Sequence, residues 1–158
     1  MKTQIQFFVS YAHADQHSAD QFLRCLQEQL APSKRYAYVL WRDTALLAGE
    51  RWDDVIQQAL ADCQFGLLLI SPMFLSRDYI LTQELPRFIN GDAKPFIPVM
   101  LKSVNLQRHD LHGLDAYQMF RLDHHLSFDD CGTARKQREF AEALFDQIEH
   151  RLDRLVHM

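Results

Sequence analysis

The chain lacks the features of several large protein classes. No apolar run approaches the ~20 residues that a membrane-spanning helix needs, and the N-terminus carries no small-residue cleavage site of a signal peptide. The net charge is −4 over 158 residues, which argues against broad electrostatic binding to nucleic acid. These absences predict a cytoplasmic protein with no membrane partner and no direct nucleic-acid partner.

Several motifs of nucleotide-binding and catalytic proteins are also missing. Neither GxGxxG nor GxxxxGK[ST] occurs, so ordinary dinucleotide or P-loop phosphate binding is not supported. Ser71 lacks the G-x-S-x-G context of a hydrolase nucleophile. His109 and His112 have a spacing that could supply two metal ligands, but no third ligand follows at a recognised spacing, and we predict no metal site.

The cysteines do not form a disulfide or metal pattern. Cys25, Cys63 and Cys131 are odd in number and widely separated, without a CxxC pair. Reduced thiols are therefore expected, in keeping with a cytoplasmic location. Cys25 and Cys63 adjoin apolar positions, which favours buried structural roles over reactive ones.

The composition is that of one globular domain. Hydrophobic residues make up 47% of the chain and charged residues 24%, and 158 residues are enough for one sizeable core. No repeat, low-complexity tract or linker divides the sequence. We expect a single domain over residues 1–158. Whether a longer protein contains it, as its N-terminal part, stays open at this point.

Hydrophobic patterns alternate between strand-like and helix-like segments. Apolar stripes with helical spacing run over residues 19–30, 52–63 and 141–155, and Asn90-Gly91 closes a further helical segment that includes Glu84. Strands are predicted at residues 5–10, 36–41, 65–70 and 96–101, with a short fifth at 117–122. This alternation predicts an α/β fold, a flavodoxin-like doubly wound parallel sheet of about five strands flanked by helices.

Two strands can be placed within that sheet. The run Phe65 to Ile70 is apolar throughout, which is typical of a central parallel strand covered on both faces. Pro98 cannot donate to a strand ladder, so its strand should lie near an edge or be irregular.

The polar residues that follow the strands are candidates for a binding site, because ligands of such sheets bind at the carboxyl ends of the strands. Aromatic faces suit a base or nicotinamide ring, an aspartate suits ribose hydroxyls, and Arg42 or His13 suits phosphate. Packing at the sheet rim is the alternative role for the aromatic residues Tyr11 and Trp41. The candidates are Ser10, Tyr11, His13, Trp41, Arg42, Asp43 and Glu84.

The two acidic candidates also have structural alternatives. Asp43 could cap a turn with Thr44 instead of contacting a ligand. Glu84 could be a solvated helix residue paired with Arg87 at i+3.

Four blocks of sequence together resemble a Toll/interleukin-1 receptor (TIR) domain of the bacterial type. Each block alone would be weak, but their order and spacing match that family across most of the chain. The blocks are FFVSYAHAD (Phe7 to Asp15), VLWRDTALLAGERW (Val39 to Trp52), LLLISPMFLSRDYILTQEL (Leu67 to Leu85) and FIPVML (Phe96 to Leu101).

The resemblance implies an enzyme that cleaves NAD+ at the nicotinamide–ribose bond. Glu84 matches the essential glutamate of the NAD-cleaving members, and Tyr79 is the nearest aromatic residue in front of it. NAD+ would be the substrate and no cofactor is implied. The product would be ADP-ribose or a cyclic isomer, and the chain would act as an effector of bacterial anti-phage defence, controlled by a sensor domain or protein.

The competing interpretation of the resemblance is that the chain is a TIR module that binds other TIR domains and catalyses no reaction. In either case self-association through TIR–TIR contacts is implied, through the loop Thr44 to Gly49. Its adjacent leucines, Leu46 and Leu47, are poorly explained as solvated surface. They either contact a neighbouring copy, which would make activity depend on oligomerisation, or fold back near Trp52.

Overall fold

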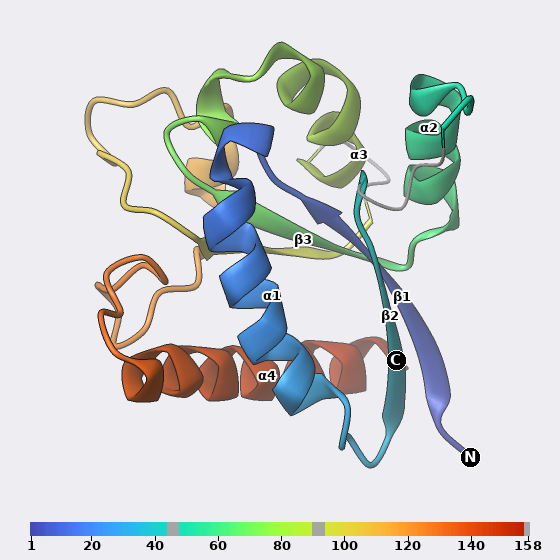
Figure 1. The fold of residues 1–158 in the computed structure, drawn as a ribbon, viewed down its shortest axis with the longest axis vertical. Helices are drawn as coiled ribbons and strands as arrows, with labels where there is room; N and C mark the ends of the chain where they lie inside the picture. Colours follow the sequence, from blue (N-terminus) through green and yellow to red (C-terminus); the bar gives the residue numbers. More distant parts are fainter. Residues whose placement is uncertain (44–47, 90–93, 157–158) are drawn as a thin grey trace.

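The protein forms an all-parallel sheet flanked by helices, as the sequence predicts (Figure 1). The computed structural model describes residues 1–43, 48–89 and 94–156. Within these ranges the sheet has four strands in the order β2-β1-β3-β4. The bounds are β1 Thr3–Ser10, β2 Tyr36–Trp41, β3 Phe65–Ile70 and β4 Phe96–Met100.

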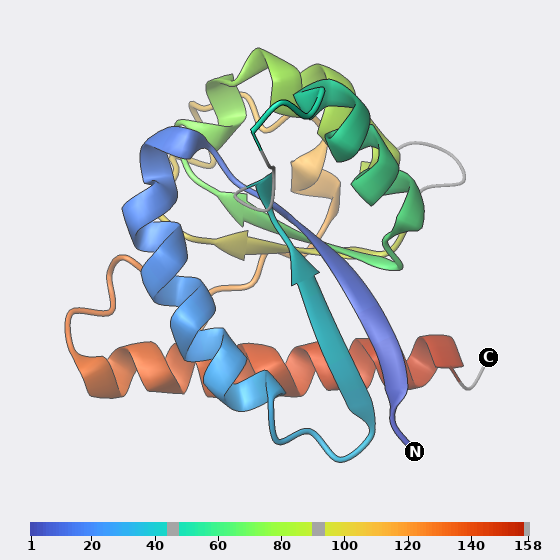
Figure 2. The same ribbon diagram turned by 45° about the vertical axis from the view of Figure 1, so that its right-hand side comes forward.

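Helices cover both faces of the sheet because the strands are apolar on both sides. On β3, Phe65, Leu67 and Leu69 face the core beneath α1 (Gln16–Leu30) and α4 (Ala134–Val156). Leu68 and Ile70 face the opposite core, beneath α2 (Trp52–Asp62) and the helical segment after β3. Figure 2 shows α1 and α4 together on one side and α2 on the other.

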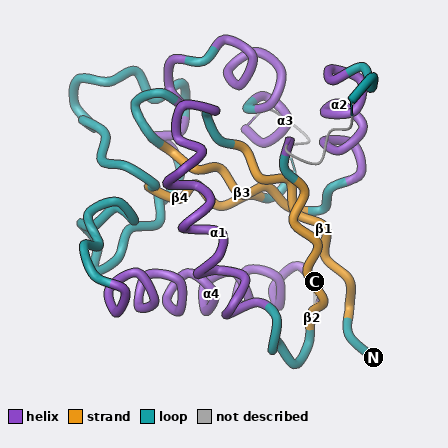
Figure 3. Tube along the Cα trace, in the orientation of Figure 1, coloured by secondary structure: helices purple, strands orange, loops and turns teal. Residues whose placement is uncertain are grey.

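The edge of the sheet at β4 differs from the expectation in one detail. β4 is the last strand of the four, as Pro98 predicts, and it pairs with β3 in parallel. The short fifth strand at residues 117–122 is reduced to an isolated bridge between Val99 and Phe120. The connection from β4 to α4 is otherwise mostly loop (Figure 3), with one 3-10 turn, η5, at Leu114–Ala116.

The segment after β3 contains two unusual features. After the 3-10 turn η3 (Phe74–Ser76), a π-helical turn, η4, spans Ile80–Glu84, and the short helix α3 spans Pro86–Ile89. The Leu85 amide donates to the Ile80 carbonyl at 2.8 Å, the five-residue spacing of a π-turn. Pro86 has no amide to donate, so the wider turn lets the chain pass from Glu84 into α3 without losing a regular helical bond.

Gly66 allows α3 to approach the sheet closely. A Cβ at this position would lie 2.4 Å from the Phe88 ring, which is itself only 1% exposed. The glycine in the otherwise bulky β3 therefore sets how near the segment carrying Glu84 can come to the strands.

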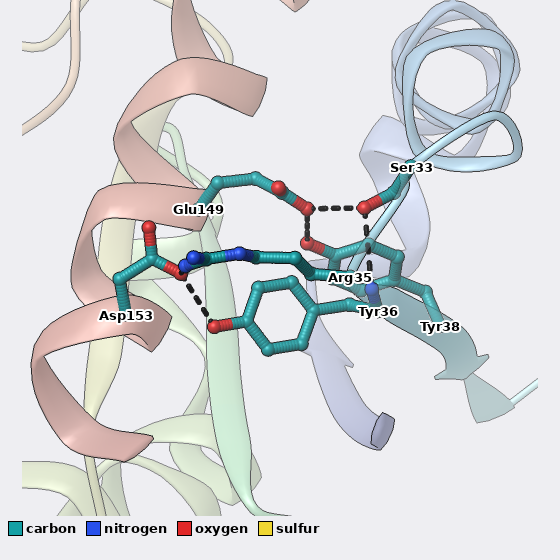
Figure 4. A network of polar contacts seen from close by, with 6 residues as sticks. All are labelled: Ser33, Arg35, Tyr36, Tyr38, Glu149 and Asp153. Carbon is teal, nitrogen blue, oxygen red and sulfur yellow. Dashed lines mark hydrogen bonds and ion pairs between the residues drawn. The ribbon is translucent and has the colours of Figure 1, made fainter. Parts of the chain in front are cut away.

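A polar network ties α4 to the outer strand β2 (Figure 4). Ser33 donates to Glu149 at 2.7 Å and Tyr38 donates to the same carboxylate oxygen. Tyr36 and Arg35 donate to Asp153 at 2.6 and 2.9 Å. Burial, followed by the bond to Asp153, raises the pKa of Tyr36 to about 12, so this hydroxyl stays a donor at neutral pH. All six residues shown in Figure 4 have partners within the network.

The cysteines are free, and Cys63 and Cys131 are buried. Burial raises the pKa of each of these two thiols. Both are therefore poor nucleophiles at neutral pH.

Candidate functional site

The carboxyl ends of β1, β2 and β3 meet at one edge of the parallel sheet, and a cavity of about 510 Å³ lies there. Five of the predicted site residues line it: Tyr11, His13, Asp43, Tyr79 and Glu84. The other lining residues are Ala12, Trp52, Ile56, Arg77, Asp78 and Ile80.

Glu84 is a buried carboxylic acid on the cavity wall. Glu84 is 8% exposed, and the Ser10 hydroxyl donates a hydrogen bond to Glu84 Oε1 at 2.6 Å. Burial raises the pKa of Glu84 to about 7; the Ser10 bond opposes this shift and the charge of Asp43 adds to it. A buried carboxyl with a raised pKa in a cleft is a candidate for chemistry.

The structural alternative in which Glu84 pairs with Arg87 does not hold. The Arg87 guanidinium instead donates to the Gln57 side chain at 2.7 Å. Ser10 therefore emerges as the partner of Glu84, contributed by the end of β1.

Asp43 is held by two residues that follow β1. The Tyr11 hydroxyl donates to Asp43 Oδ1 at 3.2 Å, and His13 Nε2 contacts Oδ2. The side chain of Asp43 is 19% exposed and that of His13 is 74% exposed, so the pair lies between the interior and solvent. Thr44, the alternative turn partner of Asp43, is outside the described residues.

Arg42 and Trp41 do not line the large cavity. Arg42 donates to the Tyr11 hydroxyl at 2.9 Å and to Asp20, and its guanidinium lies 5.0 Å from the centre of the Tyr11 ring. These contacts hold the cation behind Tyr11. The phosphate role predicted for Arg42 would require it to leave them.

Trp41 combines packing with proximity to the site. Its ring stacks on Phe8 with centroids 5.2 Å apart and an interplanar angle of 17°. It also borders a small hollow next to Asp43 and Glu84. Trp41 therefore packs at the rim of the sheet, which is the alternative role considered for it.

Tyr79 is fixed by hydrogen bonds from its hydroxyl. The hydroxyl donates to Asp53 at 2.5 Å and lies 3.4 Å from the Gln57 amide nitrogen. Burial and the bond to Asp53 raise the pKa of Tyr79 to about 12, so it is neutral and acts as an aromatic wall.

Three of the six other lining residues, Trp52, Arg77 and Asp78, carry aromatic or charged side chains that were not anticipated as site residues. Trp52 is predicted to lie on the buried stripe of its helix, but it is 55% exposed. The reason is its position as the first residue of α2, ahead of the buried Ile56, Ala59 and Leu60. Arg77 and Asp78 had no motif to mark them, and only the turn from η3 into the π-helical segment places them on the wall.

A second buried polar group supports this edge of the sheet. Ser71 donates to Asp15, and Lys102 Nζ lies 3.4 Å from the other carboxylate oxygen of Asp15. Asp15 is 2% exposed and Ser71 is fully buried. Asp15, Ser71 and Lys102 lie on the segments that follow β1, β3 and β4, so their contacts hold these three segments together beside the cavity.

No metal site is evident in the described ranges. They hold no group of three His, Cys, Asp or Glu side chains that could bind a metal ion. His109 Nδ1 accepts from the Asn105 amide, and His112 Nε2 lies 2.9 Å from the Leu75 carbonyl oxygen. These two histidines serve the loop after β4.

No helix in residues 1–43, 48–89 or 94–156 is both long and apolar enough to cross a membrane.

The leucines of the predicted assembly loop, Leu46 and Leu47, lie outside the described residues. Their predicted contact with a neighbouring copy stays a prediction.

Comparison with known proteins places the chain in a family. A family model described as "TIR domain" matches residues 7–137. A protein of Sinorhizobium fredii (strain NBRC 101917 / NGR234), named "Uncharacterized protein y4lF", is 33% identical over 101 residues. This match covers 61% of the chain and 30% of that protein, so the chain resembles only a part of its relative. The parallel sheet, the four sequence blocks and the family match agree, and the chain belongs to the TIR domain family.

Proposed function

We propose that this TIR domain cleaves NAD+ at the bond between nicotinamide and ribose, with Glu84 as the catalytic carboxylate. The observation that carries the proposal is the placement of Glu84: a buried carboxyl on the wall of a cavity large enough for part of a dinucleotide. The TIR family includes NAD-cleaving enzymes, which supports the same assignment.

The chemistry needs only one carboxylate. When the bond from ribose C1′ to the nicotinamide nitrogen breaks, its electron pair leaves with nicotinamide, which departs neutral and needs no proton. Positive charge develops on the ribose, and an ionised Glu84 would stabilise it. A water oxygen then bonds to C1′ and loses a proton, giving ADP-ribose. Attack by an adenine nitrogen would give a cyclic isomer instead.

The surroundings of Glu84 suit this role at neutral pH. A pKa of about 7 leaves roughly half of the carboxyl groups ionised near neutrality. The cationic nicotinamide ring of NAD+ would favour the ionised form further, because a nearby positive charge lowers the pKa of an acid. Ser10 orients the carboxylate through its hydrogen bond.

Asp43 and Tyr79 would position the substrate. Asp43 lines the cavity and could accept from ribose hydroxyls if the substrate displaced Tyr11 or His13 from it. Tyr79 offers a ring face held in place by Asp53. Both roles are supporting ones, since neither supplies the charge opposite the developing cation.

The biological role we propose is that of an effector in bacterial anti-phage defence, acting in the cytoplasm under a sensor domain or partner. Self-association through TIR–TIR contacts would complete or stabilise the active form. If so, nicotinamide release per molecule rises with protein concentration, and Leu46→Asp suppresses both association and release. Constant specific activity from a monomer across a wide dilution range would contradict this assembly requirement.

A non-catalytic interaction module is the competing function, and one observation favours it. The bond from Ser10 to Glu84 links β1 to the π-helical turn, which is what a purely structural buried acid would do. The two functions differ in a simple assay.

The test is release of nicotinamide from NAD+ by the concentrated or artificially clustered domain. The wild type and Glu142→Gln, a control at an exposed glutamate of α4, should release nicotinamide, and Glu84→Gln should not. No release by any of the three under clustering would favour the interaction module. Equal release by all three would remove Glu84 from the mechanism.

A further inference from the structure

The outer wall of the cavity carries an exposed tryptophan. Trp52 is 55% exposed, and it lines the cavity from the first turn of α2. Its ring lies 5.1 Å from the ring of Tyr79, with an angle of 58° between the planes. Trp52 thus keeps a large part of its aromatic surface open to solvent at the entrance of a site.

The neighbour of Trp52 is rigidly held. The Tyr79 hydroxyl donates to Asp53, the residue next to Trp52 on α2, so the same bond joins the two segments that carry the rings. Gln57, one turn further along α2, contacts both Tyr79 and Gln83. The two rings therefore form a prearranged aromatic corner, which can receive a planar ligand at a low cost in ordering.

A free cation lies on the same wall. Arg77 is exposed and lines the cavity, and its guanidinium forms no hydrogen bond or ion pair with any residue in the described part of the chain. Three acidic residues, Asp43, Asp78 and Glu84, line the same cavity. An arginine without a carboxylate partner can take a phosphate, for which its planar fork is suited.

The different burial of Glu84 and Trp52 indicates how a dinucleotide would lie in the cavity. Glu84 is 8% exposed and Trp52 is 55% exposed, so a substrate whose scissile bond reaches Glu84 leaves its other half toward Trp52. We propose that Trp52, backed by Tyr79, stacks on the adenine of the substrate and that Arg77 binds the adjoining phosphate. This assignment rests on the proposed NAD+ cleavage for its substrate, but it can be tested without turnover.

The binding test uses the fluorescence of Trp52. The chain has two tryptophans, Trp41 and Trp52, and Trp41→Phe keeps an aromatic ring against Phe8. In a Trp41→Phe/Glu84→Gln protein, AMP should quench the remaining emission saturably, whereas nicotinamide at the same concentrations should not. Quenching by nicotinamide alone, or by neither probe, would overturn the proposal. If the double variant fails to fold, the same question can be asked with Trp41 in place. AMP should then quench the Glu84→Gln protein, and this quenching should be lost in the Glu84→Gln/Trp52→Phe protein.

The kinetic test separates binding from chemistry. Trp52→Ala should raise KM for NAD+ roughly 5- to 150-fold, the range found for loss of one stacked base, with kcat changed much less. Trp52→Phe should restore most of the affinity. Arg77→Gln should raise KM by a factor that shrinks at high salt, with the exposed, remote Arg135→Gln as the matched control.

The two proposals can fail separately. AMP binding at Trp52 without any nicotinamide release would leave the subsite standing and remove the proposed reaction. Nicotinamide release with an unchanged KM in Trp52→Ala would leave the reaction standing and remove the subsite.

Discussion

Two buried or half-buried carboxylates in this protein have very different surroundings. Glu149 on α4 accepts from both Ser33 and Tyr38, within the network of Figure 4. In the described part of the chain, Glu84 accepts a single hydrogen bond, from Ser10, although it is the more buried of the two.

The number of donors around a buried acid distinguishes a structural role from a candidate functional one. Several donors stabilise the charge of a structural carboxylate and tie elements together. Glu84 has too few donors for its burial, which is why its pKa rises to about 7. The uncompensated desolvation is a cost to folding that a structural role would not require.

The largest expected effect is on catalysis at Glu84. Glu84→Gln should lower kcat by roughly 10³-fold or more, because the transition state loses a full charge. The amide keeps the shape and can still accept from Ser10. Circular dichroism should show the wild-type fold, and a variant that keeps more than a tenth of wild-type nicotinamide release would refute the catalytic role.

The pH dependence of stability should also separate Glu84 from other acids. Its folded-state pKa is above the unfolded value, so the native state favours the protonated form. The contribution of protonated Glu84 to the free energy of unfolding should be complete below about pH 4.5 and should be lost as the pH rises through about 7. The loss should be on the order of 3 kcal/mol.

The measurement is urea unfolding of the wild type and Glu84→Gln from pH 4 to pH 8. Other titrating groups contribute to both proteins and cancel in the difference. The wild type should lose stability relative to the variant as the pH rises. A difference that is independent of pH would mean that Glu84 has an ordinary pKa.

The opposite pattern is expected on α4. Glu149→Ala should lower the free energy of unfolding by about 1–3 kcal/mol, since it leaves the hydroxyls of Ser33 and Tyr38 without their acceptor. Nicotinamide release per folded molecule should be unchanged. A selective loss of activity without destabilisation would show that the two carboxylates are not as different as we propose.

The smallest effect is expected at Asp43 and Tyr79. Asp43→Asn should raise KM or lower kcat for NAD+ by about 10-fold, because positioning contributes hydrogen bonds and not the main charge. Tyr79→Ala should behave similarly. If both variants keep the wild-type kcat and KM for NAD+ in steady-state assays, the substrate lies elsewhere.

The sequence predicts the limits of two strands correctly. Residues 65–70 form a wholly buried strand that ends at Ser71-Pro72, and residues 36–41, which are only partly buried, form a strand because they are rich in aromatic and aliphatic side chains between two arginines. The edge beyond β4 is less predictable: Phe120 makes one bridge to β4 in place of a fifth strand. A hydrophobic segment can cover a sheet edge without joining the ladder.

Side-chain direction is what sequence patterns cannot supply. Trp52 fits a helical apolar stripe, yet its position at the helix start turns it toward the cavity. Arg42 suits phosphate chemically, yet Asp20 and Tyr11 hold it outside the cavity. The partner of Glu84 is Ser10, which is 74 residues away in sequence, and only the parallel register of β1 and β3 brings their ends together.

The pH profile of kcat/KM for nicotinamide release, measured on clustered wild-type protein between pH 5 and pH 8.5, bears on Glu84 without any substitution. This parameter reports groups of the free enzyme, and the active form of Glu84 is the ionised one. We predict that activity rises with pH and levels off above an apparent pKa of about 7, the value set by the burial of Glu84. A rate that is already maximal at pH 5.5, or that falls as the pH rises through 7, would contradict the assignment of Glu84 as the catalytic carboxylate.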